Sequence, residues 1–254
     1  MGARALVIVL IALLAATPAA AQRIAGALSE RQIEVTSNFV GQTLTLFGNV
    51  EPAIGAADVP VQGPFQVIVV VTGPLQDRVV RKKTNRFVIW LNTQSETFLR
   101  IPSYKWVLSS APLDAIADYA ALQSHHILLS ATEGDLQSRG NAYPALFRAE
   151  LIRLMTEKGL YGVNETGVHF ISPTLFSARI QLPGDVPNGT FLAETFLFQK
   201  NAVIAHEAES FIVRKAGLER LLGESARDYP LAYGLTCVAL ALFTGWLGGV
   251  AFRR

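Results

Sequence analysis

Cysteine is almost absent from this chain, and neither sign of charge dominates it. One of the 254 residues is a cysteine, which excludes an internal disulfide framework and a CxxC metal or redox site. Lysine and arginine number 22 against 20 aspartates and glutamates, giving a formal net charge of +2. Nucleic-acid-binding proteins gain most of their affinity by neutralising phosphates, so we predict no nucleic-acid partner. Half of the residues are hydrophobic, which excludes a disordered chain.

The motifs of common catalytic and cofactor sites are also missing. The chain has no H-E-x-x-H, no G-x-S-x-G and no G-x-G-x-x-G. The adjacent His125 and His126 would point about 100° apart on a helix, which disfavours a shared metal site. We therefore predict no cofactor and no metal, and expect a non-catalytic protein rather than an enzyme.

Hydrophobic residues are concentrated at both ends of the chain, and the first of these ends is typical of a secretory signal peptide. Arg4 precedes an apolar run over 5–16, and Pro18 precedes the small residues Ala19–Ala21. This order predicts a signal peptide over 1–21, cleaved after Ala21. An uncleaved membrane anchor is the alternative.

The other end predicts a membrane span. Residues 231–252 carry no charge, and a helix of this length would be about 33 Å long, close to the hydrocarbon core of a bilayer. Arg253 and Arg254 follow, and the positive-inside rule places them in the cytoplasm. Gly245 and Gly249 have the spacing that lets a second helix approach closely. We expect a single-pass protein that contacts the lipid bilayer through residues 231–252.

The segment between the two ends reads mainly as strands. Alternating or continuous apolar runs bounded by turn residues predict strands at 32–36, 42–47, 65–71, 78–83, 86–91, 98–109, 168–171, 176–182, 190–198 and 203–213. The run over 65–71 is continuous and valine-rich, which is typical of a central strand covered on both faces. Short strands at this spacing favour an immunoglobulin-like antiparallel β-sandwich over 22–215.

Helical patterns interrupt and follow these strands. We predict a helical insertion over about 112–159, with one helix over 112–124 and another over 144–158. The second has apolar residues at Phe147, Leu151, Leu154 and Met155, and Gly159 is expected to end it. Residues 216–229 form a predicted helical neck, 230–252 the transmembrane helix and 253–254 a cytoplasmic tail.

A basic cluster is the strongest local charge feature. It consists of Arg78, Arg81, Lys82, Lys83 and Arg86. Strand alternation would place Arg81 and Lys83 on one face and Arg78 and Lys82 on the other. A solvated hairpin with a charged edge is one interpretation. The other is a contact site for an anionic ligand, for lipid headgroups or for a partner.

Several segments together resemble a known family. They are Gly73-Pro74, Arg81–Lys83, Ile89–Asn92, Pro102–Tyr104, Ser109–Leu113, Pro230–Gly234 and Gly245–Arg254. The sequence is similar to a family of alphaproteobacterial transmembrane proteins that brings no catalytic residues with it. The resemblance implies an inner-membrane protein of a Gram-negative bacterium, with its bulk in the periplasm. It also implies a permease of the sulfite-exporter type as a partner.

These observations favour a membrane-anchored periplasmic accessory or interaction module that acts on an inner-membrane partner such as a transporter. The alternative is a periplasmic enzyme or small-ligand-binding protein with a site near the helical insertion or the basic hairpin. Its candidate residues would be Tyr104, His125, His126 and the basic cluster.

Overall fold

The architecture was analysed in a computed structural model that describes residues 22–36, 38–52, 63–86, 88–129, 138–140 and 144–251. The predicted signal peptide over 1–21 and the predicted tail over 253–254 lie outside the described residues.

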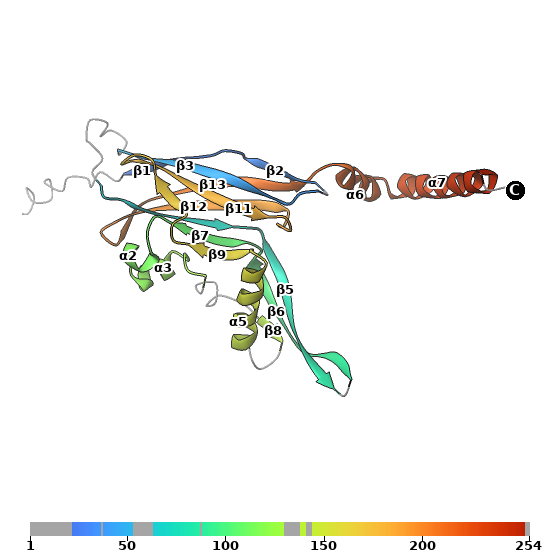
Figure 1. Ribbon diagram of the computed structural model, residues 1–254, viewed down its shortest axis with the longest axis horizontal. Coiled ribbons are helices and arrows are strands. Elements are labelled where there is room, and N and C mark those ends of the chain that lie inside the picture. The colour runs from blue at the N-terminus through green and yellow to red at the C-terminus, as the bar shows by residue number, and fades with distance from the viewer. Residues whose placement is uncertain are drawn as a thin grey trace, which may run out of the picture.

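Two β-sheets packed face to face form the body of the protein (Figure 1). The four-stranded sheet has the order β1 (Arg23–Leu28), β3 (Gly41–Glu51), β11 (Leu175–Pro183), β10 (Val168–Phe170). The six-stranded sheet has the order β2 (Gln32–Val35), β13 (Ala202–Lys215), β12 (Gly189–Gln199), β4 (Gln66–Thr72), β7 (Lys105–Ser109), β9 (Tyr161–Asn164). The prediction of a mainly β, sandwich-like fold is confirmed, whereas the immunoglobulin-like subtype stays a prediction. The two edge pairings of the larger sheet, β2 with β13 and β7 with β9, are parallel.

Strand β4 is covered on both faces, as its uninterrupted apolar sequence predicts. Val69 belongs to the core between the two sheets, and its neighbours Ile68 and Val70 point the other way. That second face is covered by two short helices, α2 (Leu113–Ile116) and α3 (Tyr119–Ser124). A strand buried on both sides cannot alternate polar and apolar residues, because neither face meets water.

The single helix predicted over 112–124 is divided into the two helices α2 and α3. Ala117 adopts an extended backbone, with φ −157° and ψ 158°, and this interrupts the helical hydrogen bonds. The predicted helix over 144–158 is confirmed as α5 (Pro144–Glu157). Gly159 ends it with φ +67°, and the amide of Leu160 donates to the carbonyl of Met155 at 2.9 Å.

A third sheet projects away from the sandwich as a long hairpin (Figure 1). It contains β5 (Leu75–Arg86), β6 (Ile89–Pro102) and the short β8 (Ser138–Gly140). The prediction of three separate strands here, at 78–83, 86–91 and 98–109, is wrong in its boundaries. The hairpin strands are longer than predicted. Strand β6 ends at Pro102, and the chain then enters the sandwich as the separate strand β7. Two register irregularities, near Asp77 and between Lys82 and Lys83, interrupt the ladder.

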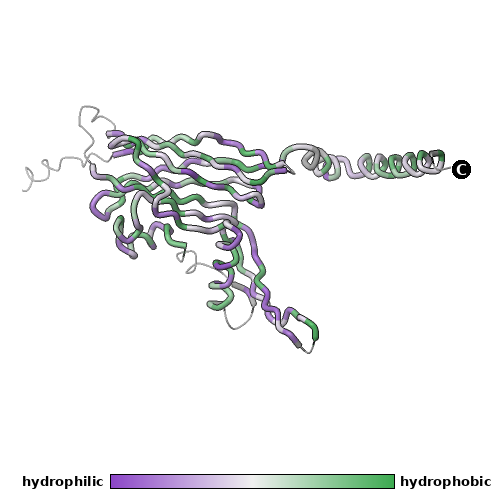
Figure 2. Tube along the Cα trace, viewed as in Figure 1, coloured by the Kyte–Doolittle hydropathy of each residue, from purple (hydrophilic) through white to green (hydrophobic). Residues whose placement is uncertain are grey.

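The chain leaves the sandwich through α6 (Leu218–Asp228) and continues into α7 (Pro230–Ala251), the apolar helix at one end of the molecule (Figure 2). Residues Pro230–Val250 are long and apolar enough to cross a membrane, and no part of this segment is buried against the rest of the described chain. This helix coincides with the predicted span.

Candidate functional site

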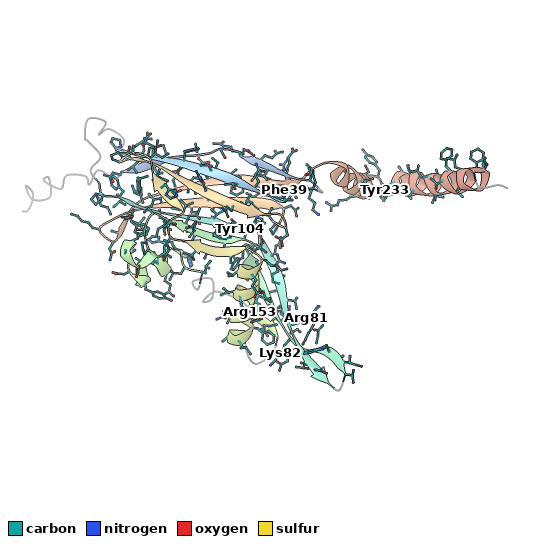
Figure 3. All side chains as sticks on the ribbon, in the orientation of Figure 1. Phe39, Arg81, Lys82, Tyr104, Arg153 and Tyr233 are labelled. Carbon is teal, nitrogen blue, oxygen red and sulfur yellow. The ribbon has the colours of Figure 1, made fainter. Side chains whose placement is uncertain are left out.

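The basic cluster of the sequence lies on β5, in the part of the hairpin that stands clear of the sandwich. Arg81 and Lys82 point away from the ribbon into open space (Figure 3). Lys83 is exposed as well. The strand positions these cations through its antiparallel ladder with β6.

A cleft of about 310 Å³ separates β5 from α5 beside these residues. Its lining consists of Val80, Arg81, Lys82, Lys83, Leu146, Phe147 and Glu150. The amphipathic sequence of α5 explains how the helix is held there, because Phe147, Leu151 and Met155 are all buried. Leu154, which the sequence placed on the same apolar stripe, is exposed instead.

The cations of β5 share a common cleft. The register shift between Lys82 and Lys83 leaves Thr93 of β6 as the extra residue, so β5 itself is uninterrupted and the division of Arg81 and Lys83 from Lys82 by strand alternation stays a prediction. All three line the cleft. Three basic residues and one carboxylate, that of Glu150, therefore line the same cleft.

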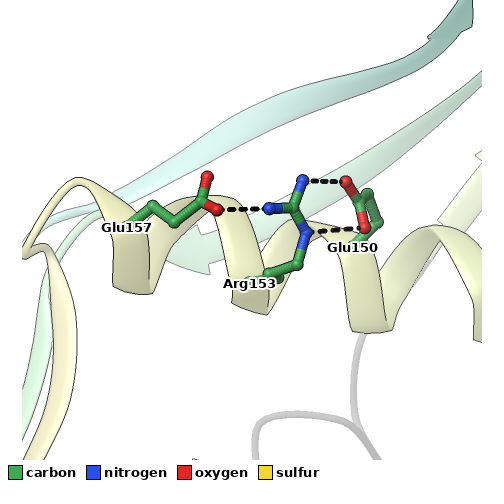
Figure 4. A network of polar contacts seen from close by, with 3 residues as sticks. All are labelled: Glu150, Arg153 and Glu157. Carbon is green, nitrogen blue, oxygen red and sulfur yellow. Dashed lines mark hydrogen bonds and ion pairs between the residues drawn. The ribbon is translucent and has the colours of Figure 1, made fainter.

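Glu150 is itself held by an ion-pair network on α5 (Figure 4). Arg153 donates through Nε to Glu150 at 3.0 Å and through Nη2 to its other oxygen, while Nη1 donates to Glu157. The hydrogen bond from Arg153 lowers the pKa of the Glu150 carboxyl. The cleft thus combines an ionised carboxylate with an excess of positive charge.

Arg78 is separate from this group. It sits near the base of the hairpin, half-buried, and its Nη2 donates to Oε1 of Gln76 at 3.1 Å. Its charge acts on Tyr161, whose pKa is raised by burial and lowered to a smaller extent by Arg78. The side chain of Arg86 lies outside the described residues. Of the five predicted basic residues, the structure brings three together.

The histidine and tyrosine candidates do not join the cleft or each other. His125 and His126 are exposed, and the ring of His125 packs against Phe196 at 5.6 Å between centroids, on the helix-covered face of the six-stranded sheet. Tyr104 is fully buried between the sheets (Figure 3), where its hydroxyl donates to the carbonyl of Gln181 at 2.8 Å. Among the described residues, no group of three or more His, Cys, Asp or Glu could hold a metal ion.

Sequence reasoning missed a buried lysine on the same helix-covered face. Lys105 is 5% exposed, and its Nζ donates to the carbonyls of His126 at 2.9 Å and Leu128 at 3.0 Å. Burial lowers the pKa of Lys105 to about 8, and the nearby Glu194 carboxylate partly opposes this. The lysine ties the segment after α3 to the sheet. Its only signal in the sequence is its position before three apolar residues in a short strand.

The two glycines singled out in the membrane span face open space. Apart from the helix's own backbone, an added Cβ at Gly245 or at Gly249 would meet no atom of the described residues within 4 Å. Four residues apart on α7, the two glycines lie on one face of the helix. Nothing within the described part of the chain requires a glycine at either position.

The sequence from residue 23 to residue 254 matches the family described as "Putative transmembrane protein (Alph_Pro_TM)". The chain belongs to this family. The resemblance seen in the sequence is therefore confirmed, and the family supports α7 as a transmembrane helix and the membrane as the location of the protein. Comparison with curated proteins and with solved structures gives no match.

Proposed function

We propose that this transmembrane protein is an accessory module that presents its sandwich in the periplasm and acts on a partner in the inner membrane. In this proposal residues 1–21 are removed as a signal peptide, residues 22–215 form the periplasmic domain, and 216–229 form a neck. The C-terminus lies in the cytoplasm. A transporter such as a permease of the sulfite-exporter type is the kind of partner we propose.

The observation that carries the proposal is the uncovered surface of α7. A helix whose glycines are not required by its own chain has room for a second helix to pack closely at Gly245 and Gly249. The exposed cations at the β5 cleft provide a second surface outside the membrane. The interior of the sandwich supports a scaffold role, because its largest buried side chains are apolar or, like Tyr104, already hydrogen-bonded.

The test is co-purification from inner membranes in mild detergent. The tagged full chain should recover a membrane protein reproducibly, and the Gly245→Leu/Gly249→Leu variant should lose it, because leucine side chains hold helices apart. Thr236→Leu is the matched control, since it adds bulk to roughly the opposite face of α7 and should retain the partner. A wild-type chain that is always recovered alone would refute the proposal.

A second candidate function is binding of a small anion in the β5–α5 cleft. The convergence of Arg81, Lys82 and Lys83 on one cavity favours it. Inorganic phosphate binding to the full chain, measured by calorimetry, should weaken with salt and be lost in Arg81→Gln/Lys83→Gln. Equal binding by this variant and the wild type would exclude the cleft.

A further inference from the structure

The far end of the β5–β6 hairpin carries a run of exposed apolar side chains. Val88 is 89% exposed, Ile89 64%, Trp90 65% and Leu91 48%. We call these four residues the hairpin tip. A contiguous apolar surface facing water is unfavourable unless another medium covers it.

Strand β6 carries apolar side chains of the tip on both faces of the hairpin, although their β5 partners Thr84, Asn85 and Arg86 are polar. Successive residues of a strand point to opposite sides, so Trp90 lies on one face and Ile89 and Leu91 on the other. A protein partner that docks on a strand covers one face and leaves the other in water. A medium that surrounds the tip would cover both faces, and the hydrocarbon edge of a bilayer is such a medium.

Positive charge lies within the turn of the tip, where Arg86 pairs with Ile89, and continues behind the tip. Lys83 pairs with Asn92, Lys82 with Gln94 and Arg81 with Ser95 in the hairpin ladder. At about 3.3 Å per residue, these cations stand within roughly 3 to 13 Å of Leu91 along the strand. Between residues 80 and 95 the sequence contains no aspartate or glutamate. Apolar side chains that enter a bilayer interface by about 5–10 Å would place these cations at the lipid phosphates.

The position of the hairpin in the molecule agrees with this arrangement. It leaves the sandwich obliquely, and its tip leans toward the end from which α6 and α7 extend, reaching the level of α6 (Figure 1), so the tip reaches the bilayer when the sandwich tilts about the α6–α7 junction. Because α7 already anchors the chain, the tip meets the bilayer at a high effective concentration and needs little affinity of its own. Tryptophan, the largest side chain of the tip, favours the membrane interface.

We propose that the hairpin tip is a second membrane contact, in which Val88, Ile89, Trp90 and Leu91 enter the interface of the bilayer that α7 spans. Arg81, Lys82 and Lys83 bind anionic lipid headgroups. The contact is made by the chain itself and does not depend on the partner proposed above.

A fluorescent label at the tip tests this in the full chain. Cys237→Ala removes the one native thiol, and Val88→Cys then carries an NBD label at an exposed position in nanodiscs of phosphatidylglycerol and phosphatidylcholine. We expect blue-shifted emission, quenching by spin-labelled lipid and protection from aqueous dithionite. Ser95→Cys is the matched control, because it is exposed on the same hairpin behind the tip, and its label should remain open to dithionite.

The headgroup contact is tested by Arg81→Gln/Lys82→Gln/Lys83→Gln in the labelled chain. Each basic residue near an anionic surface strengthens attachment roughly fivefold, so the triple variant should lower the ratio of inserted to free tip roughly a hundredfold. High salt, or discs of phosphatidylcholine alone, should also lower the ratio of inserted to free tip.

Two results would overturn the proposal. Free access of dithionite to the Val88 label would show that the tip stays in water. Protection from dithionite without quenching by spin-labelled lipid would show that protein covers the tip. Loss of a co-purified partner in Gly245→Leu/Gly249→Leu, with lipid quenching intact, would separate this contact from the proposed function.

Discussion

A glycine on β3 is required by an aromatic ring on the neighbouring strand. Gly48 pairs with Phe176 of β11, and an added Cβ at Gly48 would lie 2.2 Å from Cζ and 2.6 Å from Cε2 of that ring. Carbon atoms in contact stand about 3.5–4.0 Å apart, so the ring would have to move by more than an ångström. Phe176 is fully buried and packs edge-on against Phe170, which leaves it no free space.

We expect Gly48→Ala to destabilise the protein. Overpacking of a core costs about 1–3 kcal/mol. Replacing glycine also stiffens the unfolded chain, which offsets about 0.4–1 kcal/mol of that loss. The net loss is up to about 2.6 kcal/mol, or up to roughly 10 °C in Tm for a domain of this size, and the large displacement that the ring would need places it toward the upper end. Urea unfolding of the full chain in detergent, followed by near-UV circular dichroism, measures it as a lower midpoint at constant slope.

Gly26→Ala is the matched control, because Gly26 is the direct partner of Gly48 on β1. Its added Cβ would meet the nearest atom, Cγ of Glu209, at an ordinary 3.5 Å, so this variant should be neutral or slightly stabilised. In a Phe176→Leu background the cost of Gly48→Ala should shrink, since the obstructing ring is gone. Equal midpoints for Gly48→Ala and Gly26→Ala, or no coupling to Phe176, would refute the steric explanation.

Four further outcomes follow from groups in or beside the core. Gly162→Ala, whose added Cβ would lie 2.7 Å from the indole of Trp106, should lower the midpoint of the same urea titration, because the half-buried indole can move outward only by giving up the hydrogen bond that its Nε1 donates to the carbonyl of Gly159 at 2.9 Å. Tyr104→Phe should cost about 1 kcal/mol, because the carbonyl of Gln181 loses its donor, and a neutral midpoint would contradict this. Lys105→Met should cost about 1–3 kcal/mol, because two part-buried hydrogen bonds to backbone carbonyls lose their charged donor. Folding lowers the pKa of Lys105 from 10.5 to about 8, so between these pH values the unfolded chain binds one proton more than the folded chain. The stability of the wild type relative to Lys105→Met should therefore rise with pH from about 8 to 10.5.

The elements that could be predicted from the sequence are those whose pattern is complete within one segment. The continuous run of β4, the apolar stripe and terminal glycine of α5, and the uncharged length of α7 each fix their element locally. The break at Ala117 could not be seen, because proline, aspartate and apolar residues around it all suit a single helix. It depends on how the short helices pack over Ile68 and Val70.

The candidate site was predictable in composition and not in geometry. The basic residues of β5 are evident in the sequence, but the cleft that they line depends on α5, which follows more than sixty residues later. The buried state of Lys105 depends on carbonyls from another segment, and the glycine at 48 depends on a ring from β11. Each of these is a contact between distant parts of the chain, and the hydrophobic periodicity of a single segment cannot predict such contacts.

The proposed tip contact also changes how the cleft should be interpreted. Arg81, Lys82 and Lys83 line the cleft and stand directly behind the tip, so a tip in the bilayer would bring the mouth of the cleft to the level of the lipid headgroups. Headgroup phosphates and a soluble anion would then compete for the same three cations. A single helix leaves the sandwich free to tilt about α6, whereas a second contact on a hairpin strand of twelve residues, about 40 Å long, would fix that tilt. The orientation of the sandwich toward a membrane partner would in this way depend on the anionic lipid content of the bilayer.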